Sequence, residues 1–179
     1  MADRRAAVAL VLAALAPFSA GAGCGGGAPA TSSPPASGAS APAPSGGAGE
    51  AAAASDCLAI AGAKRAKKPN EPAKVTVKHV LVKYAGAKNA PAQITRTREA
   101  ACLRAQDARK KLEGGASFAD VVKELSDEAG AATREGMVGA IQRSDVAPAF
   151  ADAAFELAIG EVSHVVESPF GFHVIYRSE

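Results

Sequence analysis

The stretch SPFGFHVIYRSE, residues 168–179, has the pattern of a tight turn followed by the closing β-strand of a fold. Pro169 and Gly171 are turn residues, and the run that follows is mostly apolar, β-branched or aromatic. His173 lies in the middle of this run. A single histidine in a core strand is more often a hydrogen-bonded structural residue than a site residue, so its partners must be sought elsewhere in the chain.

A second strand signal, VTVKHVLVKY, covers residues 75–84 and is bounded by proline and glycine. Because alternate residues of a strand point to one face, His79 shares a face with Val75, Val77 and Leu81. The folded region therefore opens and closes with strands that each carry a histidine.

Helical periodicity dominates the sequence between these two strands. We expect helices at residues 95–113, after Ser117, and at 148–157, and further strands at 138–142 and 162–166. The order βαα-β-α-ββ predicts an α+β domain over residues 75–179, with a small antiparallel or mixed four-stranded sheet surrounded by helices.

Composition excludes several classes of protein. The chain of 179 residues has a net charge of +2, no tryptophan and two tyrosines, so a nucleic-acid-binding surface is not expected. The spacing of Cys and His residues suggests no metal site. We expect a monomer.

The N-terminal residues 1–23 have the pattern of a signal peptide, with Arg4 and Arg5 before a short apolar run and small residues after it. Two cleavage sites compete. Residues 20–22 fit an A-x-A site, whereas residues 21–24 resemble a bacterial lipobox in which Cys24 is acylated. A lipid anchor on Cys24 is the favoured interpretation and would place the protein on a membrane of the bacterial cell envelope.

Residues 24–74 are predicted to be a disordered tether and a basic spacer, because residues 25–54 hold almost only Gly, Ala, Pro, Ser and Thr. The basic run at residues 64–68 is followed by Pro69 and Pro72. A disulfide between Cys57 and Cys102 is possible in an oxidising compartment, but two unpaired cysteines are slightly favoured.

Five motifs occur in order along residues 75–179: KHVLVK, ITRTREAA, SFADVVKELSDE, FADAAFEL and SPFGFHVI. Together they resemble the parvulin family of peptidyl-prolyl cis/trans isomerases. The resemblance implies an enzyme that rotates X–Pro bonds in proline-containing polypeptides, and it implies no cofactor. The peptide bond resists rotation with a barrier of roughly 18–20 kcal/mol, so such a site must favour the twisted amide.

The resemblance also implies the site residues. His79 and His173 match the paired histidines beneath the family's catalytic site, and Ser168 matches a hydroxyl that joins their network. His164 has no such context and is expected at the surface.

An acidic residue is expected beside the reacting bond. Glu128 stands where the family carries Cys or Asp. Because one extra residue separates this position from Gly136, either Asp127 or Glu128 could occupy it.

Substrate binding is assigned by the same resemblance to Val138, Val146 and Phe150, which would grip the proline ring. Lys83 and Lys88 match cations that recognise phosphate in one subclass, but the second residue of the basic pair is Asn89 here. We therefore expect a broad preference, mildly for Glu or Asp before proline.

The sequence thus predicts an exported isomerase that assists the folding of exported proteins. The alternatives are a holdase that binds extended segments in the same groove without catalysis, and a purely structural lipoprotein.

Overall fold

The computed structural model describes residues 47–179. The predicted signal peptide, Cys24 and the first part of the predicted tether lie outside the described residues. Within residues 47–179, none of the helices has both the length and the apolar character that crossing a bilayer requires.

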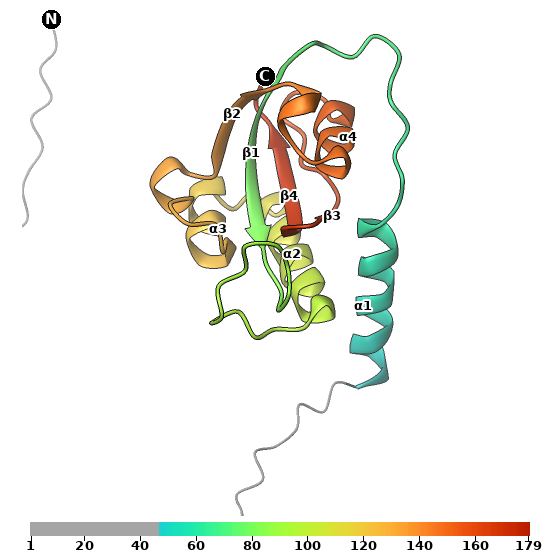
Figure 1. Ribbon diagram of the computed structural model, residues 1–179, viewed down its shortest axis with the longest axis vertical. Coiled ribbons are helices and arrows are strands. Elements are labelled where there is room, and N and C mark those ends of the chain that lie inside the picture. The colour runs from blue at the N-terminus through green and yellow to red at the C-terminus, as the bar shows by residue number, and fades with distance from the viewer. Residues whose placement is uncertain (1–46) are drawn as a thin grey trace, which may run out of the picture. The chain divides into compact units, whose positions relative to one another are not determined.

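A four-stranded sheet forms the centre of the fold (Figure 1). Its strands are β1 (Val75–Val82), β2 (Met137–Ile141), β3 (Val166–Ser168) and β4 (Gly171–Arg177), in the spatial order β2-β1-β4-β3. Every pair is antiparallel. The predicted α+β class and element order are confirmed, and the two histidine-bearing strands are the central, adjacent pair.

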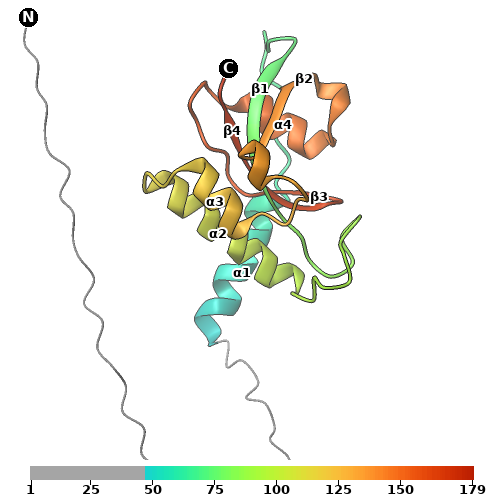
Figure 2. The ribbon, with the colours of Figure 1, turned by 90° about the vertical axis from the view of Figure 1, so that its left-hand side faces the viewer.

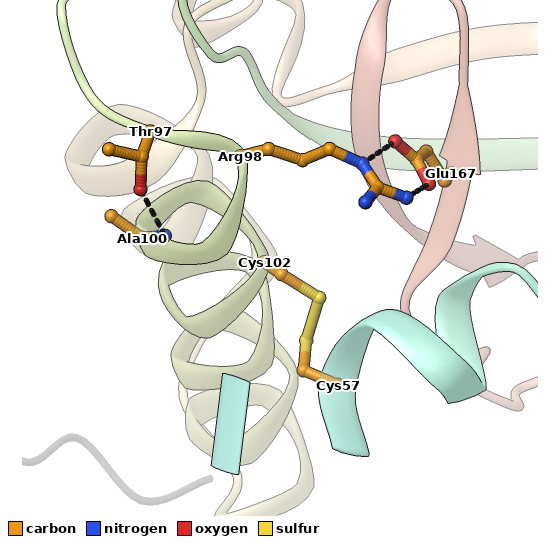
Figure 3. Close-up of a disulfide and its surroundings, with 6 residues drawn as sticks. All are labelled: Cys57, Thr97, Arg98, Ala100, Cys102 and Glu167. Atoms are coloured by element: carbon orange, nitrogen blue, oxygen red, sulfur yellow. Dashed lines mark hydrogen bonds and ion pairs between the residues drawn. A yellow bond between two sulfur atoms is a disulfide. The ribbon is translucent and has the colours of Figure 1, made fainter. Parts of the chain in front are cut away.

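Helices cover both faces of the sheet (Figures 1 and 2). The helices α2 (Arg98–Glu113) and α3 (Phe118–Leu125) lie on one face, and α4 (Pro148–Glu156) lies on the other. Side-chain caps begin two of them: Thr97 Oγ1 accepts the Ala100 N–H at 3.2 Å (Figure 3), and Ser117 Oγ accepts the Asp120 N–H at 3.1 Å. Two short 3₁₀ helices, Ala132–Arg134 and Arg143–Asp145, flank β2.

Strand alternation divides the apolar core in two. Val80 and Val82 pack toward α2 and α3, whereas Val75, Val77 and Ile175 pack toward α4. His79 and His173 occupy the same alternate positions as the second group. Both histidines therefore point to the α4 side of the sheet.

The strand predicted at residues 162–166 is wrong in its bounds. β3 begins at Val166, and Val162 forms only an isolated bridge with Tyr176. The reason lies at Ser163, whose Oγ accepts the Ile175 N–H at 2.9 Å. In a regular antiparallel pair, the Ile175 N–H would bond to a backbone carbonyl of the neighbouring strand. Here it bonds to the Ser163 side chain, so regular strand pairing does not start at this position.

The tether predicted to be disordered over residues 25–54 and the spacer that follows it instead contain a helix, α1 (Ala48–Ala61). It lies beside α2 (Figures 1 and 2). Its buried residues are Ala54, Cys57 and Ala61. The composition suggested disorder because few residues are large and apolar. Alanine, however, has the highest helix propensity, and small side chains allow two helices to approach closely.

A disulfide joins Cys57 of α1 to Cys102 of α2, with their Cα atoms 6.0 Å apart (Figure 3). The expectation of two unpaired cysteines is therefore wrong. It depended on treating the segment around Cys57 as mobile, whereas the helix there holds the thiol facing α2. Beside the disulfide, Arg98 Nε donates to Glu167 Oε1 at 2.6 Å and ties α2 to β3.

Candidate active site

The two strand histidines meet on the α4 face of the sheet. His79 pairs with Ile175 across the ladder and His173 pairs with Leu81, so the histidines are diagonal neighbours. Their Nδ1 atoms are 3.2 Å apart, and the rings are nearly parallel, at 15° with centroids 5.4 Å apart. Both side chains are buried.

A hydrogen-bonded chain extends from both ends of this pair. Ser168 Oγ lies 2.6 Å from His173 Nε2, and Glu128 Oε2 lies 2.8 Å from His79 Nε2. The chain runs Ser168, His173, His79, Glu128, and we call it the polar floor. It links β3, β4, β1 and the loop after α3.

The charge states of the polar floor follow from its surroundings. The hydrogen bond from His79 holds the pKa of Glu128 at about 2, against the opposing effect of burial and with help from Arg134. Burial, together with the neighbouring His79, lowers the pKa of His173 to about 3. At neutral pH Glu128 is therefore ionised and His173 is uncharged.

These charge states fix the direction of proton donation when His79 is uncharged. An ionised Glu128 only accepts, so the proton of His79 must be on Nε2 and its Nδ1 must accept from His173. His173 then has a bare Nε2, which accepts the Ser168 hydroxyl proton. The Phe170 N–H donates to the Ser168 oxygen at 3.1 Å and helps to hold it in place.

An open cleft of about 610 Å³ lies over the polar floor. Phe150 packs edge-on against both imidazoles, with ring centroids 5.6 Å from His79 and 5.2 Å from His173. The predicted residues that line the cleft are His79, Glu128, Val138, Val146, Phe150, Ser168 and His173. We call this hollow the main cleft.

Other residues of the main cleft were not expected from the sequence: Arg134, Met137, Asp145 and Phe170 also line it. Arg134 Nη2 lies 2.7 Å from Glu128 Oε2, the same oxygen that faces His79. Met137 and Asp145 directly precede the predicted residues Val138 and Val146, and Phe170 follows Ser168 by two positions; this proximity is a signal that could have found them. Arg134 gives no such signal, because its position depends on how the loop after α3 folds.

The structure separates the two acidic candidates. Asp127 turns away from the main cleft: its Oδ2 accepts the Lys83 N–H at 2.8 Å and pairs with Arg96. Its own N–H donates to the Leu81 carbonyl at 2.7 Å. Asp127 therefore holds the loop against β1, while Glu128 is the carboxylate at the cleft.

The two predicted cations do not line the main cleft. Lys83 Nζ donates to the Asn89 carbonyl at 2.9 Å, inside the loop after β1. Lys88 Nζ lies 5.1 Å from the centre of the Phe170 ring, at the cleft's edge. Lys88 therefore lies beside a residue of the main cleft, whereas Lys83 Nζ is bound within the loop.

A glycine fixes the distance between the cleft loop and β1. Gly136 has φ +71°, and its carbonyl accepts the His79 N–H at 2.8 Å. A Cβ on Gly136 would lie 2.6 Å from the His79 carbonyl oxygen. Only glycine therefore fits at this approach, and the approach positions His79 beside Glu128.

Among residues 47–179, no group of three or more His, Cys, Asp and Glu side chains is arranged to hold a metal ion. His164 is exposed, as its sequence context indicated, and takes no part in the polar floor.

Comparisons with known proteins agree on one domain type. The model of the PPIC-type PPIase domain, the rotamase family, matches residues 79–179. The putative peptidyl-prolyl cis-trans isomerase dodo of Drosophila melanogaster is 35% identical over 122 residues, which is 65% of this chain and 73% of that protein. The chaperone SurA of Chromohalobacter salexigens is 42% identical over 71 residues, which is 40% of this chain but only 16% of SurA.

Among solved structures, the peptidyl-prolyl isomerase ESS1 from Candida albicans superposes with a TM-score of 0.55 and 28% identity. The match covers 63% of this chain and 66% of that structure. The similarity supports the α+β fold independently of the motifs.

Proposed function

The chain belongs to the PPIC-type peptidyl-prolyl isomerase family, and from this premise we propose that the main cleft catalyses rotation of the X–Pro bond in polypeptide substrates. One observation carries the proposal. A continuous polar floor, Ser168 to Glu128, lies directly beneath an apolar hollow in which Phe150 packs against both histidines.

The apolar part of the main cleft suits the chemistry of rotation. A planar amide carries a large dipole through resonance, and the twisted amide loses that resonance and much of the charge separation. Removing water from the bond therefore costs the planar forms more than the twisted form. Val138, Val146 and Phe150 supply a surface that binds the proline ring and excludes water from its amide.

We assign the polar floor to positioning and electrostatics. Glu128 and Arg134 place fixed charges beside the bond, while His79, His173 and Ser168 hold Glu128 in one geometry. No bond is made or broken in this reaction, so none of these residues acts as a nucleophile.

The proposal includes an exported protein. The signal-peptide pattern of residues 1–23 supports export, as does the Cys57–Cys102 disulfide, because disulfides persist in oxidising compartments. Lipid anchoring through Cys24 in the bacterial envelope remains our proposal. Metabolic labelling with a fatty-acid analogue tests it: the label should appear on the wild-type chain and be absent from Cys24→Ala.

A protease-coupled isomerisation assay on short X–Pro peptides tests the enzyme. We expect acceleration by the wild-type domain and at least about a tenfold loss of kcat/KM in His79→Ala, His173→Ala and Phe150→Ala, equivalent to about 1.4 kcal/mol of barrier. His164→Ala is the matched control, because this exposed histidine lies outside the main cleft.

Suppressed aggregation of an unfolded protein, with no acceleration of any peptide, would contradict the enzyme and support the holdase alternative. The same assay gives the preference before proline when Ala, Leu, Glu and phosphoserine are compared. A mild preference for Glu is expected, and Lys88 at the cleft edge is the proposed contact.

A further inference from the structure

A second hollow, which we call the side cavity, lies next to the main cleft and has the same volume of about 610 Å³. Its walls are the end of α1 with residues 62–65, Tyr84, the outer side of α4, and β3 with the turn that follows. None of the residues that form the floor of the main cleft, apart from Ser168, takes part in it.

The two hollows share a thin wall. Ser168 lines both, and neighbouring residues divide between them: Ala149 and Pro169 line the side cavity, whereas Phe150 and Phe170 line the main cleft. The wall is thus the start of α4 and the β3–β4 turn. A helix is about 10 Å across with its side chains, and an extended chain advances about 3.3 Å per residue. About three or four residues of a substrate are therefore enough to cross from one hollow to the other.

The far wall of the side cavity is built by the segment that the sequence suggested was disordered. The disulfide and the burial of Cys57 and Ala61 fix the end of α1 against α2. Beyond it, Arg65 Nη1 pairs with Glu156 Oε2 at 2.6 Å, which fixes the segment to α4. Residues 62–65 are therefore held at both ends, by α2 and by α4.

The chemistry of the side cavity suits a weakly polar chain. Ala61, Ala63, Ala149, Val166 and Pro169 give it small apolar walls. Its carboxylates already have partners: Asp152 pairs with Arg143, and Glu167 pairs with Arg98. Among the described residues Lys64 forms no ion pair, so it is the one charge at this wall open to an incoming acidic side chain.

We propose that the side cavity binds the part of a polypeptide substrate that flanks its X–Pro bond, favouring small apolar residues with an acidic side chain near Lys64. The inference rests on the proposed function, since the main cleft must hold the proline. The two hollows lie on either side of Ser168, so a chain bound in the main cleft can extend into the side cavity. This proximity favours the substrate chain as the occupant. A folding catalyst would thereby bind long unfolded chains more tightly than short peptides.

The test compares a tetrapeptide with a dodecapeptide that has the same X–Pro centre and Ala-rich flanks containing one Glu. Calorimetric titration should show the dodecapeptide binding at least about fivefold more tightly to the wild-type domain. Ala63→Trp, which fills the side cavity, should remove that advantage and leave the affinity and turnover of the tetrapeptide unchanged. Lys64→Glu should weaken only the dodecapeptide.

Ala53→Trp on the exposed side of α1 is the matched control and should keep the advantage. Backbone amide NMR shifts at residues 62–65 should move with the dodecapeptide and not with the tetrapeptide. Equal wild-type affinities, or an advantage retained in Ala63→Trp, would overturn the inference. If neither peptide is isomerised but the difference in binding holds, the proposed function fails and the side cavity stands.

Discussion

Glu128 makes its two ionic contacts in the main cleft through one oxygen. Its Oε2 faces both His79 Nε2 and Arg134 Nη2, at 2.8 and 2.7 Å. This shared oxygen keeps the carboxylate ionised and sets the direction of the hydrogen bonds along the polar floor. The neighbouring Asp127 contacts different groups, so these two adjacent acids can be tested against each other.

Glu128→Gln is expected to lower kcat/KM on the order of tenfold, about 1.4 kcal/mol of barrier, and also to lower stability at neutral pH, because the ionised carboxylate whose pKa is held at about 2 stabilises the fold. The amide can still accept from His79 but carries no charge. Asp127→Asn should cost about 1–2 kcal/mol of stability through the weakened contact with Arg96 but leave kcat/KM of the folded protein within about twofold. Peptide turnover and urea unfolding of both variants measure this; an equal loss of kcat/KM in the two variants would contradict the assignment.

At the scale of elements, the loop after α3 is coupled to β1 through Gly136. Gly136→Ala should destabilise the domain by about 2–4 kcal/mol, because the new Cβ would meet the His79 carbonyl and φ is positive. Activity should fall with it, since His79 moves. Gly139→Ala, also at positive φ but with no atom within 4 Å, should cost only about 1 kcal/mol. Thermal unfolding of the two variants measures the difference. Equal losses of stability in Gly136→Ala and Gly139→Ala would contradict the close contact between Gly136 and β1.

The link between α1 and α2 can be tested by reduction. The disulfide closes a loop with a sequence separation of 45, for which chain entropy predicts a contribution of about 4 kcal/mol at most. We expect dithiothreitol to lower the free energy of unfolding by about 2–4 kcal/mol. Cys57→Ser/Cys102→Ser should unfold at the same denaturant concentration with or without reductant. A wild-type protein that ignores reductant would show that the thiols are unpaired in solution.

At the scale of the whole molecule, stability should depend on pH through His173. Its folded pKa of about 3 lies below the ordinary value of 6.5, so the unfolded chain binds more protons between these values. The contribution of His173 to the free energy of unfolding should therefore be fully present above about pH 6.5 and be lost progressively as the pH drops below it. Glu128, lowered from 4.5 to about 2, adds to the loss only below about pH 4.5.

Urea unfolding at pH 7, 6 and 5 checks this dependence. His164, whose pKa burial also lowers, provides the control: His164→Gln should keep most of the pH dependence, whereas His173→Gln should lose most of it. If the pH dependence of stability disappears in His164→Gln, it arises from His164 and the prediction for His173 is wrong.

The sequence alone determined what depends on local pattern. Strand alternation at residues 75–82 and 171–177, helical stripes and the Ser117 cap are local patterns that extend over one turn or a few residues of chain. The Thr97 cap was missed, because the helix expected from residue 95 begins at Arg98. The pairing of His79 with His173 followed from two strands in recognisable motifs. These features survive because the local preferences and the tertiary packing agree.

Only the tertiary structure decided where segments without strong patterns lie. An alanine-rich stretch becomes α1 because α2 offers a complementary surface, and no local pattern reports a distant surface. The Cys57–Cys102 disulfide, the choice of Glu128 over Asp127, and the entry of Arg134 into the cleft all depend on distances between remote chain segments. Sequence spacing does not encode those distances, because they result from how whole elements pack.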